Sequence, residues 1–181
     1  QFLTKWGSWG SEDGLFNHPN GIAIDQDQNI YVADNGNNQR IQKFTTAGQF
    51  LAKWSSWENG DGRVWGPAGI AIDKNAFVYI AGSENDSIQK FSADGRFLTS
   101  WQSHGLDNGF FDGPGGVVSD SNNFIYVVDT RNHRIQKFTP DGQFVDTWGR
   151  SIYFDGTGEG DGEFHHPSGL AIDSNDNIYV C

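Results

Sequence analysis

Four carboxylates lie close together near the end of the sequence, namely Asp155, Glu159, Asp161 and Glu163. Carboxylate oxygens are the ligands that Ca²⁺ takes in proteins, so this segment is a candidate calcium site. The spacing does not match an EF-hand loop, however, and "GDGEF" at 160–164 aligns with the ordinary "SEDGLF" at 11–16. We therefore predict no metal and no other cofactor, and keep calcium as the minor alternative.

Histidine is the other residue type that could do chemistry here. His165 and His166 are adjacent, and neighbouring side chains of an extended segment point in opposite directions, so we expect no shared site for this pair. His18 and His166 each precede a proline, at a position where two other parts of the chain have Gly66 and Gly113. Metal ligation needs several converging ligands, which favours a packed, hydrogen-bonded histidine instead. We assign no catalytic residue.

The elements that must position these residues repeat along the chain. The stretch "RIQKFTTAGQF" at 40–50 returns as "SIQKFSADGRF" at 87–97 and "RIQKFTPDGQF" at 134–144, so equivalent residues are 47 positions apart. A period of this length is typical of stacked or radial repeat proteins. The units span residues 1–48, 49–95, 96–142 and 143–181, and the last is incomplete.

Each unit contains four segments with the pattern of short strands. The first two are of the type "GIAID" and "NIYVAD", the third is "IQKF", and the fourth is of the type "FLAKW". β-branched and aromatic residues bounded by Gly, Asn and Asp predict strands and turns. The first two strands are apolar and should be covered on both faces, whereas the third and fourth alternate with polar residues and should lie nearer solvent. Four-stranded antiparallel units of this kind predict the blades of an all-β propeller.

Residues that recur at the same place in every unit are interpreted as structural. Tryptophans end the fourth strands and should pack between blades, and aspartates close the first strands and should cap turns. These residues are Trp6, Trp54, Trp101 and Trp148, and Asp25, Asp73, Asp120 and Asp173. Asp34 and Arg40 face each other across a hairpin, and the third unit repeats the pair, while the second unit has Gly82 and Ser87 instead. This joint loss predicts an Asp–Arg ion pair that braces the hairpin.

The combined pattern resembles the NHL-repeat propeller family. The resemblance rests on "FNHPNGIAID…NIYVADNGNNQRIQKF" at 16–44, with matching positions in "FDGPGGVVSD…FIYVVDTRNHRIQKF" and "FHHPSGLAIDSNDNIYV". The family's usual ring is six-bladed, which at this period needs roughly 280 residues. The resemblance therefore implies an arc of about three to four blades, belonging to a longer protein.

The resemblance also implies two kinds of activity. Some NHL-like propellers are lyases acting on amidated-peptide precursors, and related six-bladed propellers hydrolyse lactones, with a histidine- or carboxylate-bound metal at the central axis. The inner strands of this chain offer Ile, Ala and Val at those places rather than a distinct His/Glu set. Some animal NHL domains bind RNA through a basic face, but Arg131, Arg134 and Arg150 are few against a net charge of −11.

The longer and more variable connections predict a binding surface. They run from strand two to three and from strand four to the next strand one, and alternating strand directions bring both kinds to one end, the long-loop face. Variable loops on a rigid scaffold commonly carry binding residues, and aromatic and arginine side chains dominate interfaces. The candidates are Trp57, Trp65, His104, His133, Arg150, Tyr153, Phe154 and His165, with Trp9 on the same face. The alternative is that these side chains pack their own loops.

Composition narrows the partners further. The net charge of −11 and pI of about 4.6 disfavour nucleic acid and anionic membranes. No apolar run approaches the ~20 residues needed to cross a bilayer. The single cysteine, Cys181, excludes an internal disulfide. The compartment stays open, with the Asn-x-Ser sequon at 85–87 slightly favouring a secreted protein.

We therefore predict a non-catalytic binding module that presents its long-loop face to a protein or other ligand. The alternative is a propeller enzyme, a metal-dependent lyase or a lactonase-like hydrolase, whose catalytic residues lie partly outside this chain. RNA binding is the second alternative, disfavoured by the charge. Other parts of a longer chain, or a second copy, would complete the ring.

Overall fold

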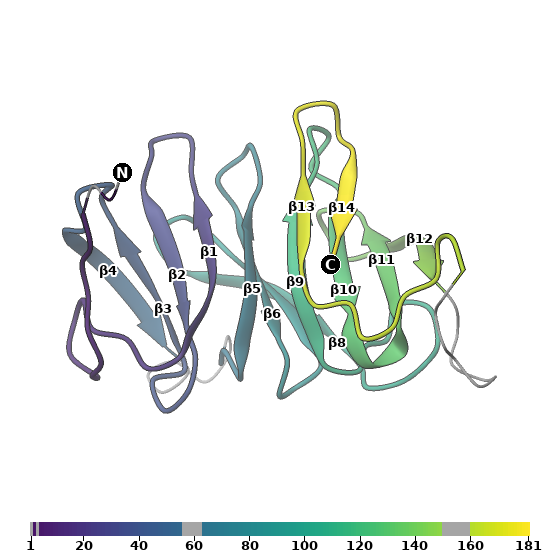
Figure 1. Cartoon of the computed structure of the whole chain (residues 1–181), viewed down its shortest axis with the longest axis horizontal. Helices are drawn as coiled ribbons and strands as arrows, with labels where there is room; N and C mark the ends of the chain where they lie inside the picture. Colours follow the sequence, from purple (N-terminus) through teal and green to yellow (C-terminus); the bar gives the residue numbers. More distant parts are fainter. Residues whose placement is uncertain (1, 3, 56–62, 150–159) are drawn as a thin grey trace.

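A computed structural model of the chain describes residues 2, 4–55, 63–149 and 160–181. The strands form three four-stranded antiparallel sheets and one two-stranded sheet, which stand side by side in an open arc (Figure 1). The longest helix in these residues is a 3₁₀ turn, η1 (Thr130–Asn132). The predicted all-β fold with four-stranded propeller blades is confirmed.

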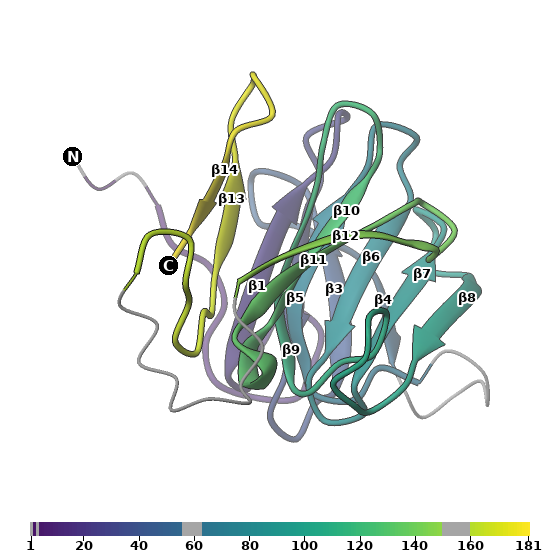
Figure 2. The ribbon, with the colours of Figure 1, turned by 90° about the vertical axis from the view of Figure 1, so that its right-hand side faces the viewer.

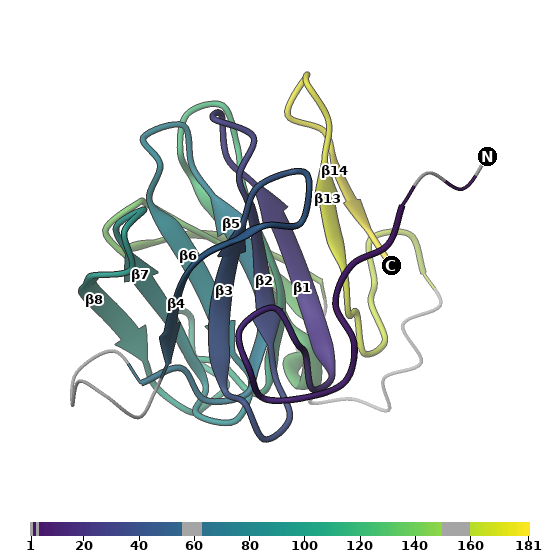
Figure 3. The ribbon, with the colours of Figure 1, turned by 90° about the vertical axis from the view of Figure 1, so that its left-hand side faces the viewer.

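The first blade contains β1 (Pro19–Ile24), β2 (Ile30–Asp34), β3 (Arg40–Phe44) and β4 (Phe50–Ser55). The second contains β5 (Pro67–Ile72), β6 (Val78–Gly82), β7 (Ser87–Phe91) and β8 (Phe97–Gln102). The third contains β9 (Pro114–Ser119), β10 (Ile125–Asp129), β11 (Arg134–Phe138) and β12 (Phe144–Gly149). The fourth is the hairpin of β13 (Leu170–Ile172) and β14 (Ile178–Val180). Figures 2 and 3 show the β13–β14 hairpin toward one side of the arc and β8 toward the other.

The first strands of neighbouring blades approach each other closely, and β1 contacts β5 while β5 contacts β9. A Cβ atom on Gly21 would lie 2.5 Å from the carbonyl oxygen of Ala68 and 3.1 Å from the backbone nitrogen of Ile70. A Cβ atom on Gly69 would lie 2.8 Å from the backbone nitrogen of Val117. Glycine opens the repeated "GIAID" motif because any side chain there would push the inner strands apart.

The turn-capping role of the repeated aspartates is confirmed. In the β5–β6 turn, Oδ1 of Asp73 accepts hydrogen bonds from the backbone N–H groups of Asn75 and Phe77, both at 2.9 Å. Its Oδ2 accepts a hydrogen bond of 3.1 Å from the Tyr79 hydroxyl. The same hydroxyl-to-carboxylate contact recurs in the pairs Tyr31–Asp25, Tyr126–Asp120 and Tyr179–Asp173. Each aspartate therefore fixes both its turn and the second strand.

Three of the four repeated tryptophans pack between blades, as predicted. Each of these three contacts the phenylalanine that ends the third strand of the next blade. The pairs are Trp6–Phe44, Trp54–Phe91 and Trp101–Phe138, with ring centroids 4.7, 6.3 and 6.2 Å apart. Trp148 stacks instead on Tyr126 of its own blade and remains 41% exposed, because the described part of the fourth blade has only the strands β13 and β14.

The prediction that the third strands lie near solvent is wrong. Every residue of β7 is buried, and Gln42 and Gln136 in β3 and β11 are 0% exposed. The preceding long connection folds over the third strand and supplies the polar partners that water would otherwise provide. Oε1 of Gln42 accepts a hydrogen bond of 2.9 Å from the Gly14 N–H, and its Nε2 donates one of 2.8 Å to the Leu15 carbonyl. The fourth strands are half-exposed, as predicted.

A first strand is covered on both faces only where it has a neighbouring blade on each side. β5 is buried at four of its six positions, because β1 and β9 both contact it. Ile22 and Ile24 of β1 are 64% and 61% exposed, since no described sheet lies against that face. None of the described helical residues form a segment long and apolar enough to span a membrane.

Candidate functional site: the long-loop face

Both kinds of long connection meet at one end of the arc, as predicted. Asn38, between β2 and β3, donates a hydrogen bond of 2.9 Å to the carbonyl oxygen of Gly10, in the segment that enters the first blade. Asn132 donates an equivalent bond of 2.8 Å to Gly105. The short β1–β2, β5–β6 and β13–β14 turns lie at the opposite, upper end in Figure 1.

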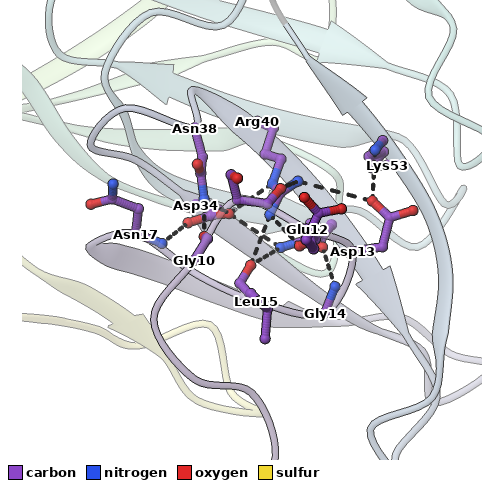
Figure 4. A network of polar contacts seen from close by, with 12 residues as sticks. Gly10, Glu12, Asp13, Gly14, Leu15, Asn17, Asp34, Asn38, Arg40 and Lys53 are labelled. Atoms are coloured by element: carbon purple, nitrogen blue, oxygen red, sulfur yellow. Dashed lines mark hydrogen bonds and ion pairs between the residues drawn. The ribbon is translucent and has the colours of Figure 1, made fainter.

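A buried ion pair holds the first of these loops (Figure 4). Nε of Arg40 lies 2.8 Å from Oδ2 of Asp34, and both side chains are buried. The remaining guanidinium groups donate to backbone carbonyl oxygens of the entering loop, at 2.7 Å to Ser11, 2.9 Å to Glu12 and 2.8 Å to Leu15. The predicted Asp–Arg brace is therefore confirmed, and it also fixes the path of the loop backbone.

The third blade repeats this arrangement. Nε of Arg134 lies 2.7 Å from Oδ2 of Asp129, and its other nitrogens donate to the carbonyl oxygens of Leu106, Asp107 and Phe110 at 2.8–2.9 Å. The second blade lacks both charges. There Gln89 of the third strand still donates a hydrogen bond of 2.6 Å to a loop carbonyl, that of Arg63.

A second set of contacts, which we call the junction bonds, joins each blade to the next. In each, the side chain just before the third strand accepts a hydrogen bond from a backbone N–H just before the next first strand. The acceptor and donor residues are Gln39 and Gly66 at 2.6 Å, Asp86 and Gly113 at 2.7 Å, and His133 and His166 at 3.0 Å. The same junction therefore uses an amide, a carboxylate and an imidazole as acceptor.

The donor position has a left-handed backbone in every blade. Its φ values are 55° at His18, 56° at Gly66, 60° at Gly113 and 50° at His166. Glycine adopts this conformation readily, and two blades have glycine at this position. The other two blades have His18 and His166 with the same backbone conformation. The four residues are equivalent for a backbone reason, independent of side-chain chemistry.

This turn overturns one expectation. His165 and His166 do not diverge, because the left-handed φ of 50° at His166 means that the segment is not extended. Their ring centroids lie 4.8 Å apart, and those of His133 lie 5.3 Å from His165 and 4.3 Å from His166. Burial lowers the pKa of His133, and the neighbouring His166 and His165 lower it further. Three imidazoles thus meet at the junction of the third and fourth blades.

The preceding junction gathers a different set. Nδ1 of His104 lies 2.8 Å from Oδ2 of Asp86, and Asp112 lies beside them, with its Oδ1 3.2 Å from Nη1 of Arg131. Sequence reasoning identified His104 but missed Asp86 and Asp112. Asp86 and Asp112 could have been found because the residues at their positions differ from unit to unit, and such differences can give a surface its specificity.

The other predicted site residues are distributed more widely. Trp65 is half-buried with the Arg63 guanidinium carbon 5.4 Å from its ring centroid, and Trp9 is 80% exposed. Oε2 of Glu163 accepts a hydrogen bond of 3.2 Å from the Gly160 N–H, and Asp161 is exposed. Six predicted residues lie outside the described parts of the chain: Trp57, Arg150, Tyr153, Phe154, Asp155 and Glu159. The calcium alternative therefore stays a prediction.

A pocket of about 480 Å³ lies on the inner wall of the arc, where the first strands begin. Glycines and small apolar side chains form most of its lining, and its polar side chains are Asn20, Ser83, Thr130 and Ser168. Of the residues that line this pocket, none carries a carboxylate, an imidazole or an ammonium group. The lining therefore supplies hydrogen-bonding groups but no general acid or base at neutral pH.

We compared the chain with protein-family models, curated proteins and solved structures. The NHL repeat family model matches residues 16–44 and 111–138. None of the curated proteins matches the chain in sequence. Among solved structures, a streptogramin B lyase is 17% identical with a TM-score of 0.65, and the match covers 88% of this chain and 46% of that one.

Two further structures are similar. Virginiamycin B lyase from Staphylococcus aureus is 15% identical with a TM-score of 0.59, over 90% of this chain and 55% of that one. A gluconolactonase from Xanthomonas campestris is 14% identical with a TM-score of 0.63, over 96% and 57%. The chain thus spans about half the length of these structures, and at such low identities the likeness concerns the fold alone. Residues 16–44 and 111–138 thus match the NHL repeat, and the described strands fold as an arc of β-propeller blades.

Proposed function

We propose that the chain is a binding module whose long-loop face recognises a protein or other ligand with a basic or mixed surface. The observation that carries this proposal is the way in which the loops are held. Arg40, Arg134, Gln42 and Gln136 fix the loop backbones through carbonyl and N–H groups, from positions that are themselves buried. These contacts hold the loop backbones without using the exposed side chain of Trp9, which can contact a partner.

A backbone held in this way favours binding. A loop that is ordered before the partner arrives loses less conformational entropy on association, so more of the contact energy appears as affinity. Trp9 and His104 extend from such loops and are exposed. An exposed tryptophan on a fixed backbone is the kind of residue that dominates interface energetics.

Charge supports a basic partner. Glu12, Glu84, Asp107 and Asp161 are exposed on the long-loop connections, within a chain whose net charge is −11. Opposite charges on two approaching surfaces raise the rate of association and make it sensitive to salt. We expect added salt to slow association more than it speeds dissociation.

Catalysis is not part of the proposal, and the residues that line the inner-wall pocket include no titratable side chain. The lyases and the gluconolactonase are relatives in fold, at 14–17% identity, and their names describe those proteins. Propeller folds carry many unrelated functions, so the fold does not transfer an activity.

Photo-crosslinking tests the face assignment. A photoreactive phenylalanine analogue replaces Trp9, Trp65 or His104 on the long-loop face, and in control chains replaces Gln49 or Asp94 in the short turns. In native extract, a discrete crosslinked species should form from the long-loop positions and not from the controls. Alanine substitution of Trp9 or His104 should then weaken binding of the identified partner without changing the melting temperature. Crosslinking from Gln49 and Asp94 alone, or from an exposed outer-strand position such as Val145, would contradict the proposal.

A further inference from the structure

The third junction carries three side chains with the chemistry of metal ligands. His133, His165 and His166 each offer one imidazole nitrogen, and these three atoms lie within 4.8 Å of one another. His165 and His166 are exposed, and in the described part of the chain neither of their imidazoles has a hydrogen-bond or ion-pair partner. Two of the three nitrogens are therefore uncommitted and accessible from solvent.

The other two junctions show that this set is not required by the fold. The position of His133 is occupied by Gln39 and Asp86 in the preceding blades. The position of His165 is occupied by Trp65 and Asp112, and that of His166 by Gly66 and Gly113. The same backbone geometry is thus built without any of these histidines, so structural need does not account for three imidazoles at one junction.

We propose that His133, His165 and His166 bind a divalent transition-metal ion, of which Zn²⁺ is the representative, at the junction of the third and fourth blades. Imidazole nitrogen suits zinc and its neighbours, whereas calcium and magnesium prefer oxygen. Three histidines leave one position of a tetrahedral ion for water or for a group supplied by a ligand. The proposal does not depend on the function proposed above.

The site is separate from the inner-wall pocket. None of the three histidines lines that pocket, although Gly113, Thr130 and Ser168 beside the junctions do. The ion would lie on the long-loop face, between the η1 turn and the segment that leads into β13. It would therefore link the third blade to the fourth.

Binding of the ion competes with the third junction bond. Nδ1 of His133 now accepts the N–H of His166 at 3.0 Å. If the ion binds Nδ1, that lone pair is used, and if it binds Nε2, Nδ1 must carry the proton. In both cases this hydrogen bond is lost, which is a small loss beside three metal–ligand bonds. The metal would then replace the hydrogen bond as the connection between the two blades.

The repeats themselves supply substitutions that keep the fold. His133→Gln places the residue found at 39, so the junction bond can form while an imidazole is lost. His165→Trp copies Trp65, and His166→Gly copies Gly66 at a left-handed position. His18→Gly is the matched control, because it changes a histidine with the same backbone conformation that lies outside the cluster. His104→Gln is the second control.

The test measures Zn²⁺ binding by isothermal titration calorimetry at pH 7.5, in the untagged chain carrying Cys181→Ser to remove the exposed thiol. One Zn²⁺ should bind per chain, and the melting temperature should rise with Zn²⁺ concentration. Each of His133→Gln, His165→Trp and His166→Gly should weaken binding at least about tenfold. Both controls should bind as tightly as the parent. Co²⁺ should give the visible absorption of a tetrahedral site in the parent and lose it in the three variants.

Two results would overturn the proposal. One is the absence of stoichiometric Zn²⁺ binding by the parent chain under these conditions. The other is binding that survives all three cluster substitutions, or that His18→Gly or His104→Gln weakens equally, since the ion would then lie elsewhere. Circular dichroism of each variant confirms that a loss of binding does not arise from unfolding.

Discussion

Nδ1 of His133 accepts a hydrogen bond of 3.0 Å from the backbone N–H of His166, and this bond joins the third blade to the fourth. The equivalent acceptors in the other junctions are the amide of Gln39 and the carboxylate of Asp86. A protonated imidazole has no lone pair to accept a hydrogen bond, whereas an amide accepts at any pH. One junction of the three is therefore sensitive to mildly acidic pH.

We expect His133→Gln to remove this sensitivity. The pKa of His133 is lowered from 6.5 by burial and by His165 and His166, so the unfolded chain binds a proton more readily than the folded one. The stabilisation that neutral His133 gives to the folded chain is fully present above pH 6.5 and is lost as the pH falls through the folded-state pKa of His133. With chelator present, the two proteins should have similar melting temperatures at pH 7.5. At pH 5 the parent should lose about 0.5–1 kcal/mol relative to the variant. An equal pH dependence in both would contradict the prediction.

Removal of one member of the Asp129–Arg134 brace should be far more harmful than removal of both. In the native protein Nε of Arg134 lies 2.7 Å from Oδ2 of Asp129. Asp129→Ala leaves the buried guanidinium without this carboxylate and should lower the free energy of unfolding by about 3–5 kcal/mol. The double substitution Asp129→Gly with Arg134→Ser copies the second blade, which folds with Gly82 and Ser87. Urea denaturation should show that the double variant is more stable than Asp129→Ala. A double variant that is no more stable than Asp129→Ala would show that the two residues do not act as a pair.

Gly69→Ala should destabilise the inner wall of the arc. The new Cβ atom would lie 2.8 Å from the backbone nitrogen of Val117, and neither strand can give way without losing its own pairing. We expect a cost of about 2–3 kcal/mol in the free energy of unfolding. Gly14→Ala is the control, because Gly14 has a φ of +82° but nothing within 4 Å of the added atom. It should cost only about 1 kcal/mol from backbone strain. Equal costs would show that strand approach is not the reason for the glycine.

Trp101→Ala should cost more stability than Trp148→Ala. Trp101 packs on Phe138 of the next blade and on Tyr79 of its own, with ring centroids 6.2 Å apart in each pair. Its removal leaves a cavity between two blades and should cost about 3 kcal/mol. Trp148 is 41% exposed, so its substitution by alanine should cost only about 1 kcal/mol. Thermal unfolding followed by circular dichroism compares the two, and a larger effect at Trp148 would mean that an additional contact covers it.

The internal repeats made the structural residues predictable. The caps formed by Asp73 and its equivalents and the Asp34–Arg40 pair could be identified because the chain provides its own comparison, including a unit that lacks both members of the pair. Burial of the third strands could not be predicted in the same way. Gln42 alternates with apolar neighbours as a solvent-facing residue would, and a sequence pattern does not distinguish water from a loop carbonyl as the partner of an amide.

The histidine cluster was missed for a local reason. Neighbouring side chains diverge only in an extended segment, and the left-handed turn at His166 removes that condition. The indication was present in the sequence, since Gly66 and Gly113 occupy the equivalent position and glycine is the usual residue for positive φ. Contacts between His133 and His165, 32 positions apart, depend on how two blades pack and required the structure.

The carbonyl oxygens that Arg40 and Arg134 bind are chemically the same whichever amino acid carries them. Substitution of Ser11, Glu12, Leu106 or Asp107 changes the outward side chain and leaves the group that the arginine holds. Most of the roughly 1 kcal/mol that each such hydrogen bond contributes is thereby independent of the loop sequence. These positions should tolerate mutation freely while their backbone stays in place, which makes the two loops natural sites for randomised libraries and for the divergence of new specificities.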